Sequence, residues 1–144
     1  MEVGMTYTKL SQVGQSLSLL RDKKIPFVLG MKLGRISKLI QDEVTEYQKT
    51  IQKVYEEFGK KTVDDKSGQT IIQIPMENRV EADDQIAKVN NTEVVLHFMA
   101  IVLDDVLEQK KSEEKDPTRA LDVNFYALIS PFMAGDVFDK LGAP

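Results

Sequence analysis

The stretch PFVLGMKLGRISKLIQDEVTEYQKTIQKVYEEFG, residues 26–59, decides the fold of this chain. Its apolar residues recur at intervals of three or four, which is the spacing of one face of an α-helix. Pro26 suits the first turn of a helix, and Gly59 suits a left-handed residue that ends one. We therefore predict one helix of roughly 33 residues, which at 1.5 Å per residue is about 50 Å long.

This helix is longer than the diameter expected for a single domain of 144 residues. We therefore expect part of its apolar face to contact a partner or a second copy of the chain, and the alternative is a helix that bends to stay within its own fold. A charge on this face, as in Ile51→Asp, should disrupt the fold or the assembly. The candidate interface residues are Ile40, Val44, Tyr47, Ile51, Val54 and Phe58.

The residues before the long helix predict a second helix that ends near Lys24. Its apolar face consists of Leu10, Val13, Leu17 and Leu20. The two helices form a predicted hairpin over residues 8–59, with its joint at Ile25-Pro26. Gly30 and Gly34 are expected to let the two helices approach each other closely.

Residues 60–144 predict a smaller α+β part. The segment DDKSGQTIIQIP, residues 64–75, predicts a β-hairpin with its turn at Asp65-Lys66-Ser67-Gly68. A short helix is predicted from an Asn78 cap to Asn90-Asn91. Residues 92–103 predict one or two strands, with a buried helix as the alternative.

The remaining residues predict an exposed loop over 108–118, because this segment has no apolar residue and ends in Pro-Thr. A short helix should begin at an Asp122 cap and stop at Pro131. The predicted fold class is α+β, in which a long N-terminal α-helical hairpin packs with a small antiparallel β-sheet and short C-terminal helices. We expect a single domain over residues 1–144.

The composition excludes several kinds of catalytic site. The chain has no cysteine, which excludes disulfides, thiolate metal ligands and cysteine nucleophiles. His97 is the one histidine and lies inside a predicted strand, where a packed or edge-strand side chain is the favoured interpretation. The adjacent carboxylates of Asp83-Asp84 and Asp104-Asp105 diverge on a helix or strand, which disfavours a metal site. We therefore predict a protein that is not an enzyme and that holds no metal or cofactor.

The joint between the two predicted helices is basic. Residues 21–38 hold six basic residues and one acid, whereas residues 81–144 hold thirteen acids and six bases. In one interpretation the free N–H groups of the long helix and nearby cations bind an anion. In the other, which we favour, the joint only connects two helices and its lysines are solvated. The anion-binding candidates are Lys23, Lys24, Phe27, Lys32 and Arg35.

Nucleic acids and membranes are disfavoured as partners. The net charge is −4, the basic cluster is short and the chain has no tryptophan, so an extended basic groove with stacking side chains is not indicated. No apolar run in the sequence approaches the length of a membrane span.

Six segments follow one another in a recognisable order. They are KKIP (23–26), EVTEYQKTIQKVYEEFGKK (43–61), DDKSGQTIIQI (64–74), ADDQIAKVNNTEVVLHF (82–98), IVLDDV (101–106) and FYALISPFM (125–133). This order resembles an uncharacterised family of small proteins encoded by tailed bacteriophages, over roughly residues 8–134. KVNNTEVVL departs from the family's usual leucine pair, and residues 135–144 have no counterpart. The resemblance implies a phage origin and no particular role.

Three functional hypotheses remain open. The favoured one is a non-enzymatic virion or assembly accessory component of the head, neck or tail, which forms a homo-oligomer and contacts other phage proteins. The second is an oligomeric anti-defence protein that sequesters a host nucleotide signal at the basic joint. The third is an inhibitor of a host protein. We expect the protein in the host cytoplasm, and in the virion under the favoured hypothesis.

Overall fold

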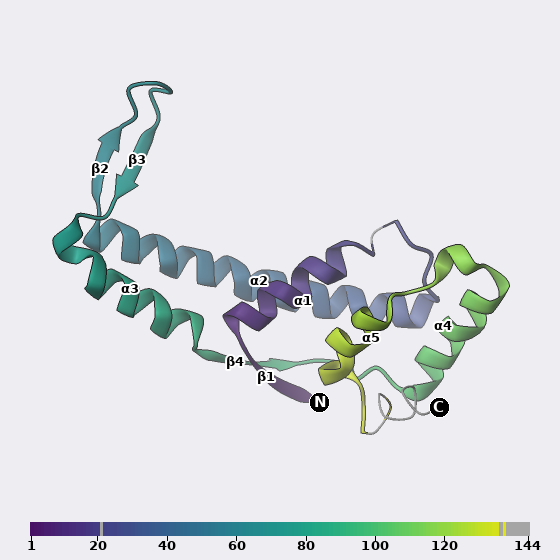
Figure 1. The fold of residues 1–144 in the computed structure, drawn as a ribbon. Helices are drawn as coiled ribbons and strands as arrows, with labels where there is room; N and C mark the ends of the chain where they lie inside the picture. The colour runs from purple at the N-terminus through teal and green to yellow at the C-terminus, as the bar shows by residue number, and fades with distance from the viewer. Residues whose placement is uncertain (21, 136, 138–144) are drawn as a thin grey trace.

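The computed structural model describes residues 1–20, 22–135 and 137 of the chain. Its fold is α+β, as the sequence predicts (Figure 1). The helices are α1 (Tyr7–Ser18), α2 (Phe27–Phe58), α3 (Met76–Asn90), α4 (Leu103–Lys115) and α5 (Val123–Ile129), with 3-10 turns at Pro117–Arg119 and Ser130–Phe132. The strands are β1 (Glu2–Thr6), β2 (Lys60–Val63), β3 (Thr70–Gln73) and β4 (Glu93–His97).

Helix α2 runs almost the whole length of the molecule (Figure 1). Its 32 residues confirm the single long helix expected from the sequence. Helix α1 packs along its first half and forms the predicted helical hairpin, with Leu10, Val13 and Leu17 buried against α2.

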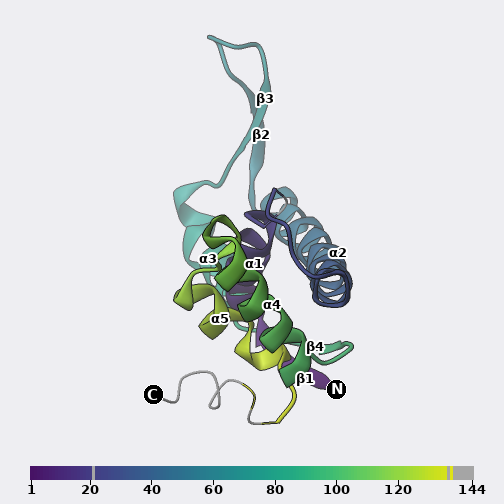
Figure 2. The same ribbon diagram turned by 90° about the vertical axis from the view of Figure 1, so that its right-hand side faces the viewer.

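Helix α3 covers the second half of α2 and runs antiparallel to it (Figures 1 and 2). The Asn78 amide near the start of α3 donates to the carbonyl oxygen of Phe58 (3.0 Å). At the other end of α3, the Tyr47 hydroxyl donates to Oδ1 of Asn90 (2.5 Å). These two contacts hold α3 against α2 at both ends.

Two separate two-stranded sheets complete the described fold. Strands β2 and β3 form the predicted hairpin, and their turn contains Gly68 with a φ of 69°. Strand β4 pairs with β1, so that Met5 lies opposite Val94 and Glu2 lies opposite His97. Residues 92–103 therefore contain a single strand followed by the start of α4, and its partner strand β1 was not predicted.

The hydrophobic core lies at the end of the molecule where α1, α4 and α5 meet the first half of α2. Phe132 and Ile129 are fully buried there, next to the β1–β4 sheet. The ring of Phe132 meets the ring of Phe98 edge-on, with centroids 5.0 Å apart. No helix within the described ranges has both the length and the apolar character that a membrane crossing requires.

The helix ends differ from the prediction in three places. Helix α1 ends at Ser18 and not near Lys24, because the chain turns directly after Leu17, the last buried residue of the helix. Gly59 is extended (φ −99°, ψ 166°) and not left-handed, because it leads directly into β2. Asn78 lies within α3 and not at its cap, which is Pro75.

The predicted loop over residues 108–118 is wrong for most of its length. Residues 108–115 belong to α4, whose inner side carries Asp105, Val106 and Gln109. This segment looked like a loop because two of the residues facing inward, Gln109 and Glu113, are polar. The helix after the Asp122 cap and the interruption at Pro131 are confirmed. Most of the tail from Gly135 to Pro144 lies outside the described residues.

Candidate functional site

The structure separates the residues of the basic joint. Lys32 points into the body, where its Nζ lies 2.5 Å from Oδ2 of Asp105, and both side chains are buried. The same Asp105 oxygen accepts a hydrogen bond from the N–H of Val102 at the start of α4 (2.9 Å). Lys32 is buried and its charge is paired with that of Asp105. It therefore links α2 to α4 and is not exposed to an external anion. Lys24, Phe27 and Arg35 are exposed.

Lys23 is engaged in a different contact. Its Nζ donates to the carbonyl oxygen of Ala120 (2.7 Å). Lys23 and Lys24 border a hollow of about 500 Å³, whose other charged lining residues are Asp22, Asp116 and Arg119. Hydrogen bonds from the hydroxyl and N–H of Thr118 lower the pKa of Asp116, which favours its charged form. Two carboxylates therefore offset two of the three cations, and the joint fits a connection between helices better than an anion site.

The six residues expected to contact a partner lie against other helices of the same chain. Ile40 and Val54 are buried, and the other four are half-buried. The Tyr47 ring stacks on Tyr7 with centroids 5.0 Å apart. Contacts within the chain cover this apolar face only in part, so contact of its four half-buried residues with a partner stays a prediction. The length of α2 is accommodated by an elongated molecule in which α1 and α3 cover successive halves of the helix.

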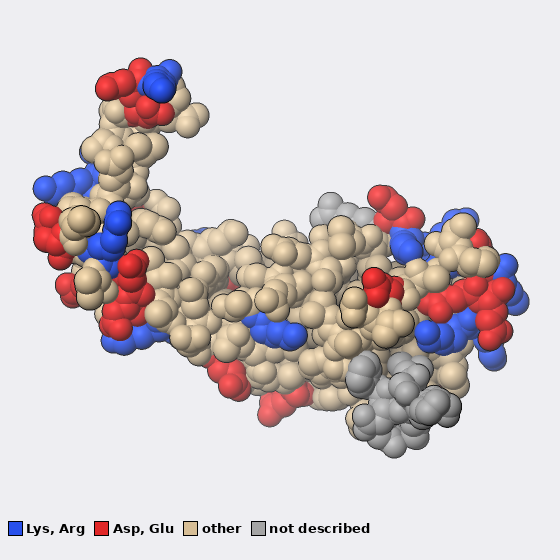
Figure 3. Space-filling model, in the orientation of Figure 1, with Lys and Arg blue, Asp and Glu red and all other residues tan. Residues whose placement is uncertain are grey.

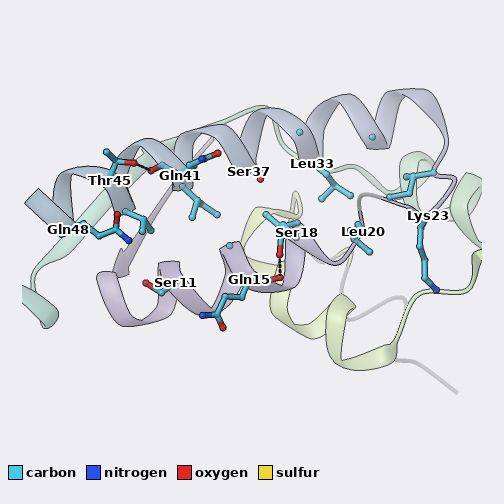
Figure 4. A pocket seen from close by; sticks show the side chains of 17 residues that line it. Ser11, Gln15, Ser18, Leu20, Lys23, Leu33, Ser37, Gln41, Thr45 and Gln48 are labelled. Carbon is cyan, nitrogen blue, oxygen red and sulfur yellow. Dashed lines mark hydrogen bonds between the residues drawn. The ribbon is translucent and has the colours of Figure 1, made fainter. Parts of the chain in front are cut away.

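An open groove lies between α1 and α2 (Figure 4). Its volume is about 760 Å³, and Leu33 and Ile40 form part of its apolar lining. Lys23 is the charged residue among the described lining side chains, and it lies at one end. Hydroxyl and amide side chains line the groove from both helices, namely Ser11, Gln15, Ser18, Ser37, Gln41, Thr45 and Gln48.

The glycines of the groove correct one prediction. A Cβ atom added at Gly30 or Gly34 would have no neighbour within 4 Å, so these residues do not mark a close approach of two helices. They widen the groove instead. The close approach is at Gly14 on α1, where an added Cβ would lie 3.2 Å from Cγ2 of Ile40.

The hydroxyl groups of the groove are partly satisfied by their own helices. Ser18 donates to the carbonyl oxygen of Gln15 (2.6 Å), and Thr45 donates to that of Gln41 (2.9 Å). The groove is therefore a nearly uncharged surface with an apolar floor. Such a surface suits contact with another protein segment better than binding of a charged metabolite.

A half-buried carboxylate, that of Glu113, joins α4 to α5, and it was not predicted because residues 108–118 looked like a loop. One oxygen of Glu113 accepts hydrogen bonds from the Gln109 amide (3.1 Å), the Leu121 N–H (2.9 Å) and the Tyr126 hydroxyl (2.9 Å). Burial alone would raise the pKa of Glu113, but these hydrogen bonds outweigh it and lower the pKa. Burial, followed by the neighbouring Glu113, raises the pKa of Tyr126. The cluster is fully used in holding the C-terminal helices together.

The β2–β3 hairpin stands clear of the body at the far end of α2, and we call residues 60–73 the arm (Figures 1 to 3). Seven of its eight strand residues are exposed. Its turn is well built, since the Asp64 carboxylate accepts from the Lys66 N–H (3.1 Å) and the Ser67 hydroxyl (2.9 Å). The arm is therefore an ordered projection and not a loose connection.

Exposed apolar side chains gather on and beside the arm. Val63 on β2 is 65% exposed and Ile71 on β3 is 38% exposed. At the base of the arm, Met76 and Val80 in the first turns of α3 are 81% and 82% exposed. Consecutive cross-strand pairs point to opposite faces of a hairpin, so Val63, opposite Thr70, and Ile71, opposite Thr62, lie on different faces of the arm, and both faces expose apolar side chains.

The described residues outside these regions show little that is typical of a catalytic centre. Within the described ranges, no three side chains of His, Asp or Glu are grouped so that they could hold a metal ion. His97 lies on the exposed side of β4, with Nδ1 3.4 Å from Oε2 of Glu2. This position matches the predicted edge-strand histidine.

No protein-family model, curated protein or solved structure matches this chain. Its function is therefore inferred from the geometry of the fold and from the order of its sequence segments.

Proposed function

We propose that this protein is a non-enzymatic accessory component of a tailed bacteriophage, an oligomeric protein that belongs to the virion or helps to assemble it. The phage origin rests on the resemblance of the ordered sequence segments. The docking role rests on one observation, the projecting arm with its exposed apolar side chains. An isolated two-stranded hairpin is marginally stable in water, so a neighbour that covers the arm would stabilise it.

A second exposed apolar area supports contacts at the opposite end of the molecule. Phe27, Val28 and Met31 lie in the first turns of α2 and are 96%, 48% and 44% exposed. The arm follows the other end of the same helix. Two separate apolar areas, one beside each end of α2, suit a protein that bridges neighbouring subunits.

The buried polar groups support a structural role. Lys32 and Asp105 satisfy each other, and the Glu113 carboxylate is occupied by three donors. A catalytic group needs access to a substrate, which the buried Lys32 and Asp105 lack. Sequestration of a nucleotide at the basic joint finds less support, because Lys32 is buried and Lys23 is bonded to Ala120.

The test is quantitative mass spectrometry of purified phage particles that carry this gene. We expect a fixed copy number per particle, or presence in assembly intermediates. A variant in which Asn-Gly replaces residues 60–73 should fall at least tenfold in particle content, because α2 and α3 retain their contacts without the arm. A matched control with an intact arm, Lys49→Ala on the exposed side of α2, should be incorporated like the wild type. Absence of the wild-type protein from particles and intermediates would overturn the proposal.

A further inference from the structure

We propose that the neighbour covering the arm is a second copy of this chain, and that the two copies pair through their β3 strands. Antiparallel pairing of β3 with the second copy's β3 would build one four-stranded sheet from two arms, in the order β2-β3-β3-β2. This inference deepens the proposed function and rests on the arm being a docking element.

The two free edges of the arm differ in charge. The outer edge of β2 carries Lys60 and Lys61, and lysine is a residue that natural sheets use to keep free edges from pairing. The outer edge of β3 reads Thr-Ile-Ile-Gln over residues 70–73 and has no charge. Its two isoleucines favour strand pairing. The β3 edge is therefore the edge that is open to another strand.

The hydrogen bonding of the arm fixes which β3 residues face outward. The N–H of Asp64 donates to the carbonyl oxygen of Gln69 (2.8 Å), and two residues further along Thr62 lies opposite Ile71. Because bonded and non-bonded pairs alternate in an antiparallel ladder, the backbone groups of Ile71 point toward β2. Those of Thr70 and Ile72 then point to the free edge.

A two-fold axis at Ile71 satisfies these outward groups. In this register Thr70 lies opposite Ile72 of the second copy, and by symmetry Ile72 lies opposite Thr70 of the second copy. The two residues of each pair exchange backbone hydrogen bonds. Ile71 lies opposite Ile71 of the second copy in a non-hydrogen-bonded pair. In such a pair the Cα atoms are about 4.5 Å apart and the side chains touch. Gln73 lies opposite Gln69 of the second copy, so no like charges meet along the new edge.

The same register places the second copy near one exposed residue at the base of the arm. Ile74 lies level with Gly68 of the second copy, so the second copy's turn ends beside the start of α3. Met76, which is 81% exposed, lies two residues further on. Pairing of the arms would thus place a second chain next to this apolar side chain.

Because the chain has no cysteine, engineered thiols can test the pairing directly. Ile71→Cys places one thiol on the two-fold axis, within the Cα separation of about 4.4–6.8 Å that a disulfide needs. Thr62→Cys is the matched control, since Thr62 is the cross-strand neighbour of Ile71 on the same face. In the four-stranded sheet the two Thr62 residues are three strand spacings apart, about 14 Å. We expect oxidation to link Ile71→Cys into a dimer at least tenfold faster than Thr62→Cys.

Sedimentation of the unmodified chain provides the second measurement. The wild type should be a dimer, Ile71→Lys should raise the dissociation constant more than tenfold, and Thr62→Lys should leave it unchanged. Circular dichroism melts show whether each variant is folded. A monomeric wild type, or equal crosslinking of the two cysteine variants, would overturn the pairing.

The particle measurement separates this inference from the proposed function. A crosslinked dimer that is absent from phage particles would keep the β3 pairing and overturn the assembly role. A monomer that is still present in particles would overturn the pairing and assign the arm to a different phage protein.

Discussion

The two halves of α2 carry the same apolar stripe but lie in different surroundings. In the first half, Ile36 is 1% exposed inside a core to which α1, α4, α5 and the β1–β4 sheet contribute. In the second half, Ile51 is half-buried, and α3 is the main covering helix. An amphipathic pattern therefore predicts which side of a helix is covered, but the depth of burial depends on how many other elements reach that side.

The largest effect on stability should come from placing the same charge at two positions of this apolar face, one in each half of α2. Ile36→Asp buries an unpaired carboxylate, and we expect it to lower the free energy of unfolding by more than about 4 kcal/mol. Ile51→Asp can turn its charge toward water, and we expect a loss of about 1–2 kcal/mol. Urea denaturation followed by circular dichroism measures both. This difference revises the expectation that Ile51→Asp disrupts the whole fold.

Equal losses in the two variants would show that the second half of α2 is as strongly held as the first. Hydrogen exchange of the Ile51→Asp variant provides a finer measurement. Amides of α3 should exchange faster in it, while those of α1 should keep their protection.

The buried ion pair should produce the next largest effect, again in the core half. Lys32→Met leaves the Asp105 carboxylate buried without its cation, and we expect a loss of about 3–5 kcal/mol. Lys49→Met is the matched control on the same helix, because Lys49 pairs with Glu46 on the exposed surface. Its effect should be below about 0.5 kcal/mol. Thermal or urea unfolding with less than 1 kcal/mol between the two variants would argue against a structural role for the pair.

The fold was predictable where local signals agree with the tertiary structure. The stripe of α2 specifies a helix without help from the rest of the chain, and the turn before Gly68 and the cap at Asp122 are local signals too. Strand β1 was missed because it is formed only by pairing with β4, which is distant in sequence. The alternation of Val3 and Met5, both turned toward the core, was the signal that could have revealed it.

The candidate sites were less predictable because they depend on long-range contacts. Lys32 looks like any solvated lysine until Asp105 is placed beside it by α4. Residues 108–115 looked like a loop because they include no apolar residue, and two of the donors to Glu113, the Leu121 N–H and the Tyr126 hydroxyl, lie outside its own helix. The arm, in contrast, was predicted as a hairpin, but its projection from the body follows from the packing of α3 on α2.

The Glu113 carboxylate makes the stability of the core half dependent on pH. Its pKa is lowered in the folded protein, so its stabilisation is complete above the ordinary glutamate value of 4.5 and is lost as pH falls through the folded pKa. We expect Glu113→Gln to lower the free energy of unfolding by about 2 kcal/mol at pH 7. The difference from the wild type should shrink below pH 4.5. Urea titrations across this range measure it.

Glu114→Gln is the matched control for this pH dependence, because Glu114 is the exposed neighbour on the same helix. It should leave the free energy of unfolding almost unchanged at both pH values. A pH-independent difference between Glu113→Gln and the wild type would mean that the carboxylate contributes through its shape and not through its charge.

The smallest effects should come from two glycines of opposite role. An alanine Cβ at Gly59 would collide with Ile72 and with the Tyr55 carbonyl oxygen, so Gly59→Ala must shift the root of the arm and cost about 1–2 kcal/mol. Gly34→Ala adds a methyl group to the open groove in the interior of α2, and it should stabilise the protein by about 0.5–1 kcal/mol. Thermal melting curves measure whether each substitution lowers or raises the stability. If Gly34→Ala stabilised the isolated chain but reduced its content in phage particles, the groove as well as the arm would contact a neighbour.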